Sequence, residues 1–199
     1  MSGLTILLLA AGASRRMGGV DKLLEQIDGV ALLRRQAMAA VSTGCPVIVA
    51  LPPRALARLV VLTGLGVAVI EVAQAHLGMG ESLKIAAMAA GEPDGLMVML
   101  ADMPEITSAD LTLLIDAFHA RPDHIVRAAA QDGTPGHPVV FPARLFPALT
   151  ALQGDAGARS VLEGELPLIL RLLGTRSTTD LDTPEDWANW RARRSGISD

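Results

Sequence analysis

The stretch from Thr5 to Lys22 reads TILLLAAGASRRMGGVDK, and it joins a nearly unbroken apolar run to a small-residue loop that carries three cations. The run Thr5–Leu9 contains no charged side chain, which is typical of a strand buried on both faces of a parallel sheet. Gly12 and its alanine neighbours follow the run directly. This order predicts that the chain begins its fold with a buried strand and a tight loop.

Further short apolar runs alternate with longer helical patterns along the chain. The runs that predict strands are Val47–Leu51, Val67–Val72, Met97–Leu100 and Ile125–Ala129. The patterns that predict helices are Leu32–Val41, Arg54–Leu62, Ser82–Ala90 and Ala109–Ala120, the last with an N-cap at Thr107 or Ser108. This alternation predicts a three-layer α/β/α domain with a mostly parallel sheet and right-handed crossovers.

The last third of the chain departs from this rhythm. Asp132-Gly133 is a hairpin-type turn before Pro138–Phe141, which predicts an antiparallel element in the sheet. A short helix is expected from Ala158, and Thr183 begins a capped final helix over Glu185–Arg193. Because no linker or repeat interrupts the chain, we expect residues 1–199 to form one domain, with Trp187 and Trp190 as packing residues.

Composition excludes several classes of protein. Half of the 199 residues are hydrophobic, the mean hydropathy is +0.39, and 17 cations against 21 acids give a net charge of −4. Such an acidic chain lacks the basic surplus of a nucleic-acid binder. The longest apolar stretch, Leu59–Ile70, contains Gly64 and Gly66 and is too short for a membrane span. The single Cys45 excludes an internal disulfide, so we expect a reduced, cytoplasmic protein without nucleic-acid or membrane partners.

The loop after the first strand carries the clearest chemical signal. Small residues at Ala10–Ala13 allow backbone N–H groups to approach phosphates, and Arg15, Arg16 and Lys22 supply positive charge. The loop lacks the Gly-Lys-Ser/Thr of a P-loop and the spacing of a dinucleotide-binding G-x-G-x-x-G motif. A solvated surface turn is the alternative, but three cations directly after a buried strand favour polyphosphate binding.

Two acidic sites suggest a divalent metal. Asp102 follows an apolar strand and is held by Pro104, where a carboxylate is well placed to bind magnesium together with phosphate oxygens. The segment Asp180–Asp186 supplies four carboxylates, of which Glu185 and Asp186 are expected at the helix N-terminus. Asp182 is the preferred second ligand, with Asp180 the alternative.

Two glycine-rich turns complete the candidate site. The first, Gly78–Leu83, and the second, Gly136–Val139, each flank an apolar run and could contact a base or an acceptor. His137 alone is more typical of a structural histidine than of a catalyst. Since the chain offers no catalytic serine or cysteine arrangement, the pattern favours direct in-line attack on phosphorus.

The same motifs resemble the nucleotidyltransferases that mature the molybdenum cofactor. The matching segments are LAAG at 9–12, RMG at 16–18 with Lys22, GMGESL at 78–83, ADMP at 101–104, GHPV at 136–139, GDAGAR at 154–159 and DLDTPED at 180–186. The GHPV and GDAGAR pair is most similar to the cytidylyltransferase branch. This resemblance implies a GT-A-like, Rossmann-like fold that transfers CMP from CTP to the phosphate of molybdopterin and releases pyrophosphate.

The resemblance also implies a role for each matching residue. Nucleotide-binding residues would be Leu9, Ala10, Ala11, Gly12, Arg15, Arg16, Lys22, Gly80 and Ser82. The main chain of residues 10–12 would cradle the base and phosphates, while Arg16 and Lys22 would neutralise the triphosphate. Asp102 and Asp182 would hold Mg²⁺, so Arg16, Lys22 and Asp102 form the catalytic set. The residues expected at the acceptor are His137, Asp155 and Arg159.

Other functions fit parts of this pattern. The LAAG loop favours CTP over GTP, but residues 16–22 are as similar to the guanylyltransferase pattern. A sugar or polyol phosphate is an alternative acceptor. A non-catalytic chaperone that delivers the cofactor to a molybdenum hydroxylase is an alternative of another class. An oxidoreductase of similar fold is disfavoured, because no motif indicates a flavin or nicotinamide site.

Overall fold

The fold is organised around one seven-stranded sheet in the computed structural model, which describes residues 3–152 and 158–196. The strand order is β5-β4-β1-β6-β8-β7-β9. The strands are β1 Leu4–Leu9, β4 Val47–Leu51, β5 Ala68–Glu71, β6 Gly95–Leu100, β7 Val126–Ala129, β8 Pro135–Pro142 and β9 Leu168–Arg171. Among the described strands of this sheet, β8 alone runs antiparallel to its neighbours, which are β6 and β7. The predicted α/β fold with one antiparallel element is therefore confirmed.

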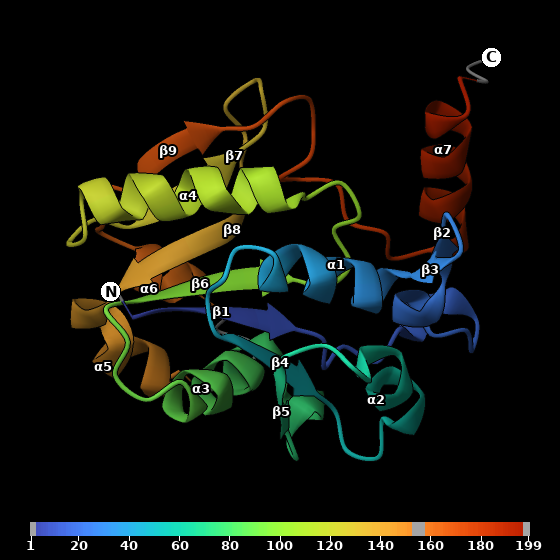
Figure 1. Cartoon of the computed structure of the whole chain (residues 1–199), viewed down its shortest axis with the longest axis horizontal. Helices are drawn as coiled ribbons and strands as arrows, with labels where there is room; N and C mark the ends of the chain where they lie inside the picture. Colours follow the sequence, from blue (N-terminus) through green and yellow to red (C-terminus); the bar gives the residue numbers. More distant parts are fainter. Residues whose placement is uncertain (1–2, 153–157, 197–199) are drawn as a thin grey trace.

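Helices cover both faces of this sheet because the central strands alternate their side chains between two apolar cores. In β1, Ile6 and Leu8 face one core, whereas Leu7 and Leu9 face the other. Figure 1 shows α1 and α4 on one side of the sheet and α3, α5 and α6 on the other. The helices are α1 Leu32–Val41, α2 Leu56–Leu62, α3 Met79–Ala89, α4 Ser108–Ala120, α5 Phe146–Thr150, α6 Arg159–Leu162 and α7 Pro184–Arg194.

The strand β5 differs from its expected environment. It pairs with β4 at the edge of the sheet, and Val69 keeps 40% of its surface exposed. The expectation that this run is buried on both faces is wrong, since an edge strand has one neighbour and lies outside the helical layers. The long apolar stretch at residues 59–70 is divided between α2, a turn and β5. No helix in residues 3–152 or 158–196 is long and apolar enough to cross a membrane.

The helix α3 begins three residues before the expected start at Ser82. Gly78, at φ 123°, ends the preceding 3₁₀ turn, and the helix starts at Met79. Gly80 and Ser82 therefore lie in the first helical turn, so the expectation of a turn over residues 78–83 is wrong beyond Gly78. The reason is that Met79, Glu81 and Leu83 are all compatible with a helix, and a positive φ is needed only at Gly78.

Short elements outside the expected pattern complete the sheet and the C-terminal region. The strand β9 pairs with β7, and the hairpin of β2 (Gln26–Ile27) and β3 (Val30–Ala31) lies near α7 in Figure 1. Arg191 and Arg194 of α7 form ion pairs with Glu25 and Asp28 beside this hairpin. These contacts attach the last helix to the chain that follows the loop of residues 10–21.

The helices α4 and α7 begin with the caps that the sequence indicates. Thr107 and Asp110 form a reciprocal capping box at α4, and Thr183 and Asp186 form one at α7. The buried Trp187 packs edge-on against Trp190, with ring centroids 6.1 Å apart. The cap fixes where α7 starts, and it thereby fixes the position of the acidic residues immediately before it.

A close backbone approach at Gly136 gives a test of the fold. A Cβ at this position would lie 1.8 Å from the Ser177 carbonyl oxygen, and the neighbouring His137 N–H donates to that same oxygen at 2.8 Å. We expect Gly136→Ala to lower the free energy of unfolding by about 3 kcal/mol, because two backbone segments must separate. Urea unfolding measures the change.

Gly66→Ala is the matched control for this substitution. No atom lies within 4 Å of a Cβ placed on Gly66, and its φ is not in the left-handed region. We expect Gly66→Ala to change the free energy of unfolding by less than about 0.5 kcal/mol. Equal stability of the two variants would show that the approach of residues 136 and 177 does not constrain the fold.

Candidate active site

The carboxyl ends of β1 and β6 bring distant segments of the chain together. These strands are parallel neighbours with Leu9 opposite Leu100, and the Ala101 N–H donates to the Leu9 carbonyl at 3.1 Å. The Leu181 N–H donates to the Asp102 carbonyl at 3.1 Å, which attaches the segment before α7 to the same edge. The loop after β1, Asp102 and Asp182 therefore meet where open α/β sheets bind their ligands.

Lys22 is the centre of this meeting point. Its Nζ atom donates to Asp102 Oδ2 and to Asp182 Oδ1, at 2.5 Å in each case. The Lys22 side chain is 9% exposed, whereas Arg16 is exposed and pairs with the other oxygen of Asp182. The sequence-predicted residues Arg16, Lys22, Asp102 and Asp182 thus form one connected cluster of alternating charge.

The charges in this cluster act on each other strongly. Burial alone would lower the pKa of Lys22, but the carboxylates of Asp102 and Asp182 raise it above the ordinary value. Burial raises the pKa of Asp180, and the negative charges of Asp182 and Asp102 raise it further. Lys22 therefore remains a cation in the cluster, while Asp180 is near the cluster without bonding to Lys22.

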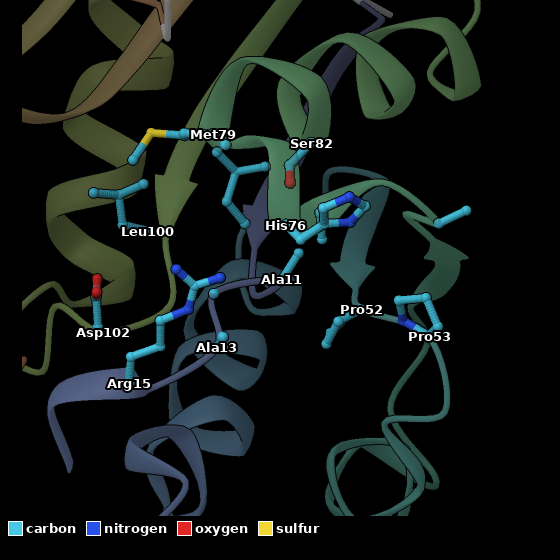
Figure 2. Close-up of a pocket in the computed structure, with 15 residues that line it drawn as sticks. Ala11, Ala13, Arg15, Pro52, Pro53, His76, Met79, Ser82, Leu100 and Asp102 are labelled. Atoms are coloured by element: carbon cyan, nitrogen blue, oxygen red, sulfur yellow. The ribbon is translucent and has the colours of Figure 1, made fainter. Parts of the chain in front are cut away.

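A cavity of about 620 Å³ lies beside the cluster. Figure 2 shows Arg15 and Asp102 on one side of this cavity and Pro52 and Pro53 on the other. The predicted site residues that line it are Leu9, Ala11, Gly12, Arg15, Ser82 and Asp102. Gly80 is buried in α3 and does not line the cavity. His76 does line it, although no sequence motif indicated this histidine.

The loop after β1 is held in an unusual backbone conformation. Ser14, Gly18 and Gly19 all have positive φ angles, of 49°, 62° and 96°. Glycine adopts such angles readily, but serine does so at a cost in conformational free energy. The buried Met17 anchors the 3₁₀ turn Arg15–Met17, so the two arginines are presented from a fixed backbone.

Arg58 of α2 supports this loop from behind, and the sequence analysis missed it. Its guanidinium donates to the carbonyl oxygens of Ala10 at 2.6 Å and Gly12 at 2.9 Å, and to both oxygens of Asp21 at 2.7 and 2.8 Å. Arg58 is 5% exposed. The Ala10 N–H is bonded to the Ala50 carbonyl, so both main-chain groups of Ala10 are engaged within the protein. Ala10 therefore supports the loop, rather than offering free main-chain groups to a nucleotide as the resemblance implied.

A second cavity, of about 530 Å³, contains the other predicted residues. His137 and Arg159 line it, and Met79 lines both this cavity and the one beside Lys22. Asp155, the third residue expected at an acceptor, lies outside the described residues. The two cavities thus meet at the start of α3, as neighbouring sites for two reactants would.

The carboxylates of Asp102 and Asp182 fit a divalent metal ion. Their oxygens converge on one point, now taken by Lys22 Nζ, and Asp102 Oδ1 is buried without a hydrogen-bond partner in the part of the chain that the structure describes. Oxygen donors suit Mg²⁺ or Mn²⁺. No group of three or more acidic, histidine or cysteine side chains among residues 3–152 and 158–196 could hold a metal, so further ligands would come from substrate and water.

The contacts of Arg58 predict that its loss destabilises the loop. We expect Arg58→Ala to lower the free energy of unfolding by about 3 kcal/mol, since Asp21 loses its ion pair and two backbone carbonyls lose their bonds to the guanidinium. Urea unfolding at pH 7 measures this loss. Arg35→Ala, which removes a 3.7 Å surface ion pair to Asp28, serves as the control and should cost less than about 0.5 kcal/mol.

The pH dependence of stability gives a second readout of the same contact. Burial alone would raise the pKa of Asp21, but the hydrogen bonds and charge of Arg58 hold it below the ordinary 3.8. The stabilisation from Asp21 is therefore complete above that value and is lost as the pH falls through the folded pKa. If Arg58→Ala were as stable as the native chain, or kept the same acid-dependent loss, Arg58 would not hold the loop.

Comparisons with known proteins agree with this geometry. Residues 6–170 match the family described as MobA-like NTP transferase domain. The chain is 31% identical over 195 residues to nicotine blue oxidoreductase of Paenarthrobacter nicotinovorans, covering 91% of this chain and 93% of that protein. It is 32% identical over 97 residues to purine catabolism protein PucB of Bacillus subtilis, covering 47% of this chain and 45% of PucB.

Solved structures share the fold. Rv0371c from Mycobacterium tuberculosis superposes with a TM-score of 0.82 at 28% identity, over 95% of this chain and 97% of that one. Its complex with manganese superposes with a TM-score of 0.79 at 26% identity, over 94% of this chain and 97% of that one. A nucleotidyl transferase from Methanothermobacter superposes with a TM-score of 0.78 at 21% identity, over 98% of this chain and 99% of that one. The family and the fold support nucleotidyl transfer as the reaction class. The chain belongs to the MobA-like NTP transferase domain family, whose members resemble the nucleotidyltransferases of molybdenum cofactor maturation.

Proposed function

We propose that this protein transfers CMP from CTP to the phosphate of molybdopterin, with Mg²⁺ as cofactor and pyrophosphate as the second product. The observation that carries the proposal is the position of Lys22, which lies between Asp102 and Asp182 at the edge of the cavity that Asp102 lines. A second cavity shares Met79 with the first. One cation and two converging carboxylates can bind a metal-bound triphosphate. The second cavity then provides a place for the acceptor.

The nucleotide would bind in the cavity of about 620 Å³. Leu9, Ala11 and Gly12 border its base and sugar, and Ser82 reaches it from the first turn of α3. Arg15, Arg16 and Lys22 neutralise the triphosphate, for which Lys22 exchanges its carboxylate partners for phosphate oxygens. Asp102 and Asp182 would hold a magnesium ion, which would supply positive charge to the phosphates.

The reaction needs no nucleophile from the protein. An oxygen of the acceptor phosphate forms a bond to the α-phosphorus of CTP. The bond between that phosphorus and the oxygen that bridges it to the β-phosphorus breaks. The electron pair leaves with pyrophosphate. Both reactants are polyanions, so the nearby cations must offset their repulsion, and the two cavities must hold them in line. His137 and Arg159 line the acceptor side of this arrangement.

Several choices within this proposal rest on the resemblance alone. The LAAG sequence at residues 9–12 favours CTP, and GTP is the alternative donor. A molybdenum hydroxylase would be the client that receives the product. The cytoplasm is the expected location of this protein. Nicotine blue oxidoreductase bears the name of a different reaction class, so reduction of nicotine blue is the dye reaction to test against.

A nucleotide panel tests the donor. We expect CTP with Mg²⁺ to raise the melting temperature of the native protein and to support pyrophosphate release with molybdopterin, because binding to the native state stabilises it by mass action. GTP with Mg²⁺ should give a smaller shift and slower release. Turnover with GTP but not CTP would overturn the choice of base. Dye reduction without pyrophosphate release would overturn nucleotidyl transfer.

Asp102→Asn tests whether the cluster carries the chemistry. We expect kcat to fall at least about 100-fold, since the variant loses one of the two converging negative charges. Asp28→Asn is the control, because Asp28 is an exposed carboxylate at φ 53°, a conformation that asparagine tolerates. If Asp102→Asn supported full cofactor maturation, the protein would act as a chaperone and not as a transferase.

A further inference from the structure

Arg127 lines the second cavity, and no sequence motif indicated this second cation beside Arg159. Its strand neighbours Val126 and Ala128 pack in the core on the opposite face of the sheet. Arg127 therefore faces α3 and α6, and it lines the cavity of about 530 Å³ together with His137 and Arg159. Its Nε atom donates to the Gly136 carbonyl at 3.1 Å, which fixes the guanidinium beside the His137 turn.

The charge of Arg127 has no counter-ion among the residues that the structure describes, which do not include Asp155. No carboxylate in residues 3–152 or 158–196 lies within salt-bridge distance of it, and burial lowers the pKa of its half-buried guanidinium. The other buried cations differ: Arg58 is paired with Asp21, and Lys22 with Asp102 and Asp182. An unpaired charge at such a position costs free energy unless a ligand provides the opposite charge.

His137 adds a buried nitrogen atom to this cavity, although its ring is also hydrogen-bonded to the Val98 backbone. Its Nδ1 atom is buried and makes no hydrogen bond within the described residues. Burial and the charge of Arg127 lower its pKa, while a hydrogen bond with the Val98 backbone and the charge of Asp102 act in the opposite direction. A ligand group that reached both Arg127 and His137 would lie in the part of the cavity that these two side chains line.

The rest of the cavity wall is mostly apolar. Met79, Leu83, Val98, Val139 and Leu162 contribute to it, and Arg159 is a second lining arginine without a partner among the described residues. The wall thus combines an apolar surface with two cations. This combination fits a ligand whose apolar body carries one dianionic group.

We propose that Arg127, with His137 and Arg159, binds the phosphate monoester group of the acceptor. The assignment of this phosphate to the acceptor rests on the proposed function. The binding of an anion at this site does not depend on nucleotidyl transfer. Arg127 and Arg159 hold the phosphate by charge-assisted hydrogen bonds, and the His137 ring lines the same cavity. A phosphate monoester is preferred over a carboxylate because two arginines match a dianion.

Histidine ring signals in ¹H–¹⁵N NMR spectra test the two cavities separately. His76 lines the nucleotide cavity and His137 the second one, and the chain contains four histidines in all. The probes are methyl phosphate for the second cavity, acetate as the carboxylate comparison, and CTP with Mg²⁺ for the first. We expect methyl phosphate to shift the His137 signal more than acetate does at equal concentration.

Arg127→Met is the decisive variant. We expect it to bind methyl phosphate about 10- to 100-fold more weakly, since a hydrogen bond to a charged group is lost. Its melting temperature should not fall by more than about 3 °C, because methionine suits the apolar wall and the unpaired charge is removed. A purely structural arginine would instead lower the melting temperature strongly. Arg171→Met, on the neighbouring strand β9, is the control and should leave both properties unchanged.

The outcomes separate this inference from the proposed function. Native-like methyl phosphate affinity in Arg127→Met, a larger fall in its melting temperature, or acetate binding as tight as methyl phosphate would overturn the anion site. Loss of the CTP response at His76 in this variant would also overturn it, because Arg127 would then act on the nucleotide cavity. If the native protein shows the Arg127-dependent His137 shift but no response to CTP, the anion site stands and the proposed transfer fails.

Discussion

The ammonium group of Lys22 connects three parts of the chain that are far apart in sequence. Asp102 lies 80 residues beyond Lys22 and Asp182 lies 160 residues beyond it, yet both carboxylates bond the same nitrogen. Without this cation, the negative charges of Asp102, Asp180 and Asp182 would repel each other at one edge of the sheet. The position of the loop, the end of β6 and the segment before α7 all depend on this shared contact.

The distribution of charge explains how an acidic protein can receive polyanions. The chain carries a net charge of −4, but single cations lie at separate places in the fold, and each has its own surroundings. Arg58 shapes the loop through Asp21, and Lys22 joins the carboxylates that a metal would use. Arg127 is bonded to the Gly136 carbonyl but has no carboxylate partner in the described chain. Under the proposed function, Arg58 and Lys22 shape the nucleotide site, and Arg127 binds the acceptor.

Much of the fold follows from sequence because its central strands are continuous apolar runs. The positions of β1, β4, β6 and β7 could be predicted in this way, and so could the placement of Asp102 at the edge where the loop lies. The strand β9 could not, because its side chains alternate between partly buried and exposed positions and it is only four residues long. The early start of α3 was missed because Gly78 and Gly80 resemble one continuous turn.

The supporting residues of the site were harder to predict than its motifs. Arg58 lies in a helical pattern in which an arginine normally faces solvent, and its contacts to Ala10 and Asp21 depend on tertiary packing. Arg127 interrupts an apolar strand, and nothing local indicates which cavity it faces. Such residues act through positions fixed by distant segments, so the structure is needed to find them.

The fate of each phosphorus atom of CTP tests the central claim most directly. CTP labelled with ³²P at the α-phosphate is incubated with the protein, Mg²⁺ and molybdopterin, and a parallel reaction carries the label at the γ-phosphate. Direct transfer predicts that the α-label moves to the pterin product while the γ-label leaves as pyrophosphate, in equal amounts. Release of the γ-label as inorganic phosphate, or retention of the α-label in free CMP or on the protein, would contradict the account.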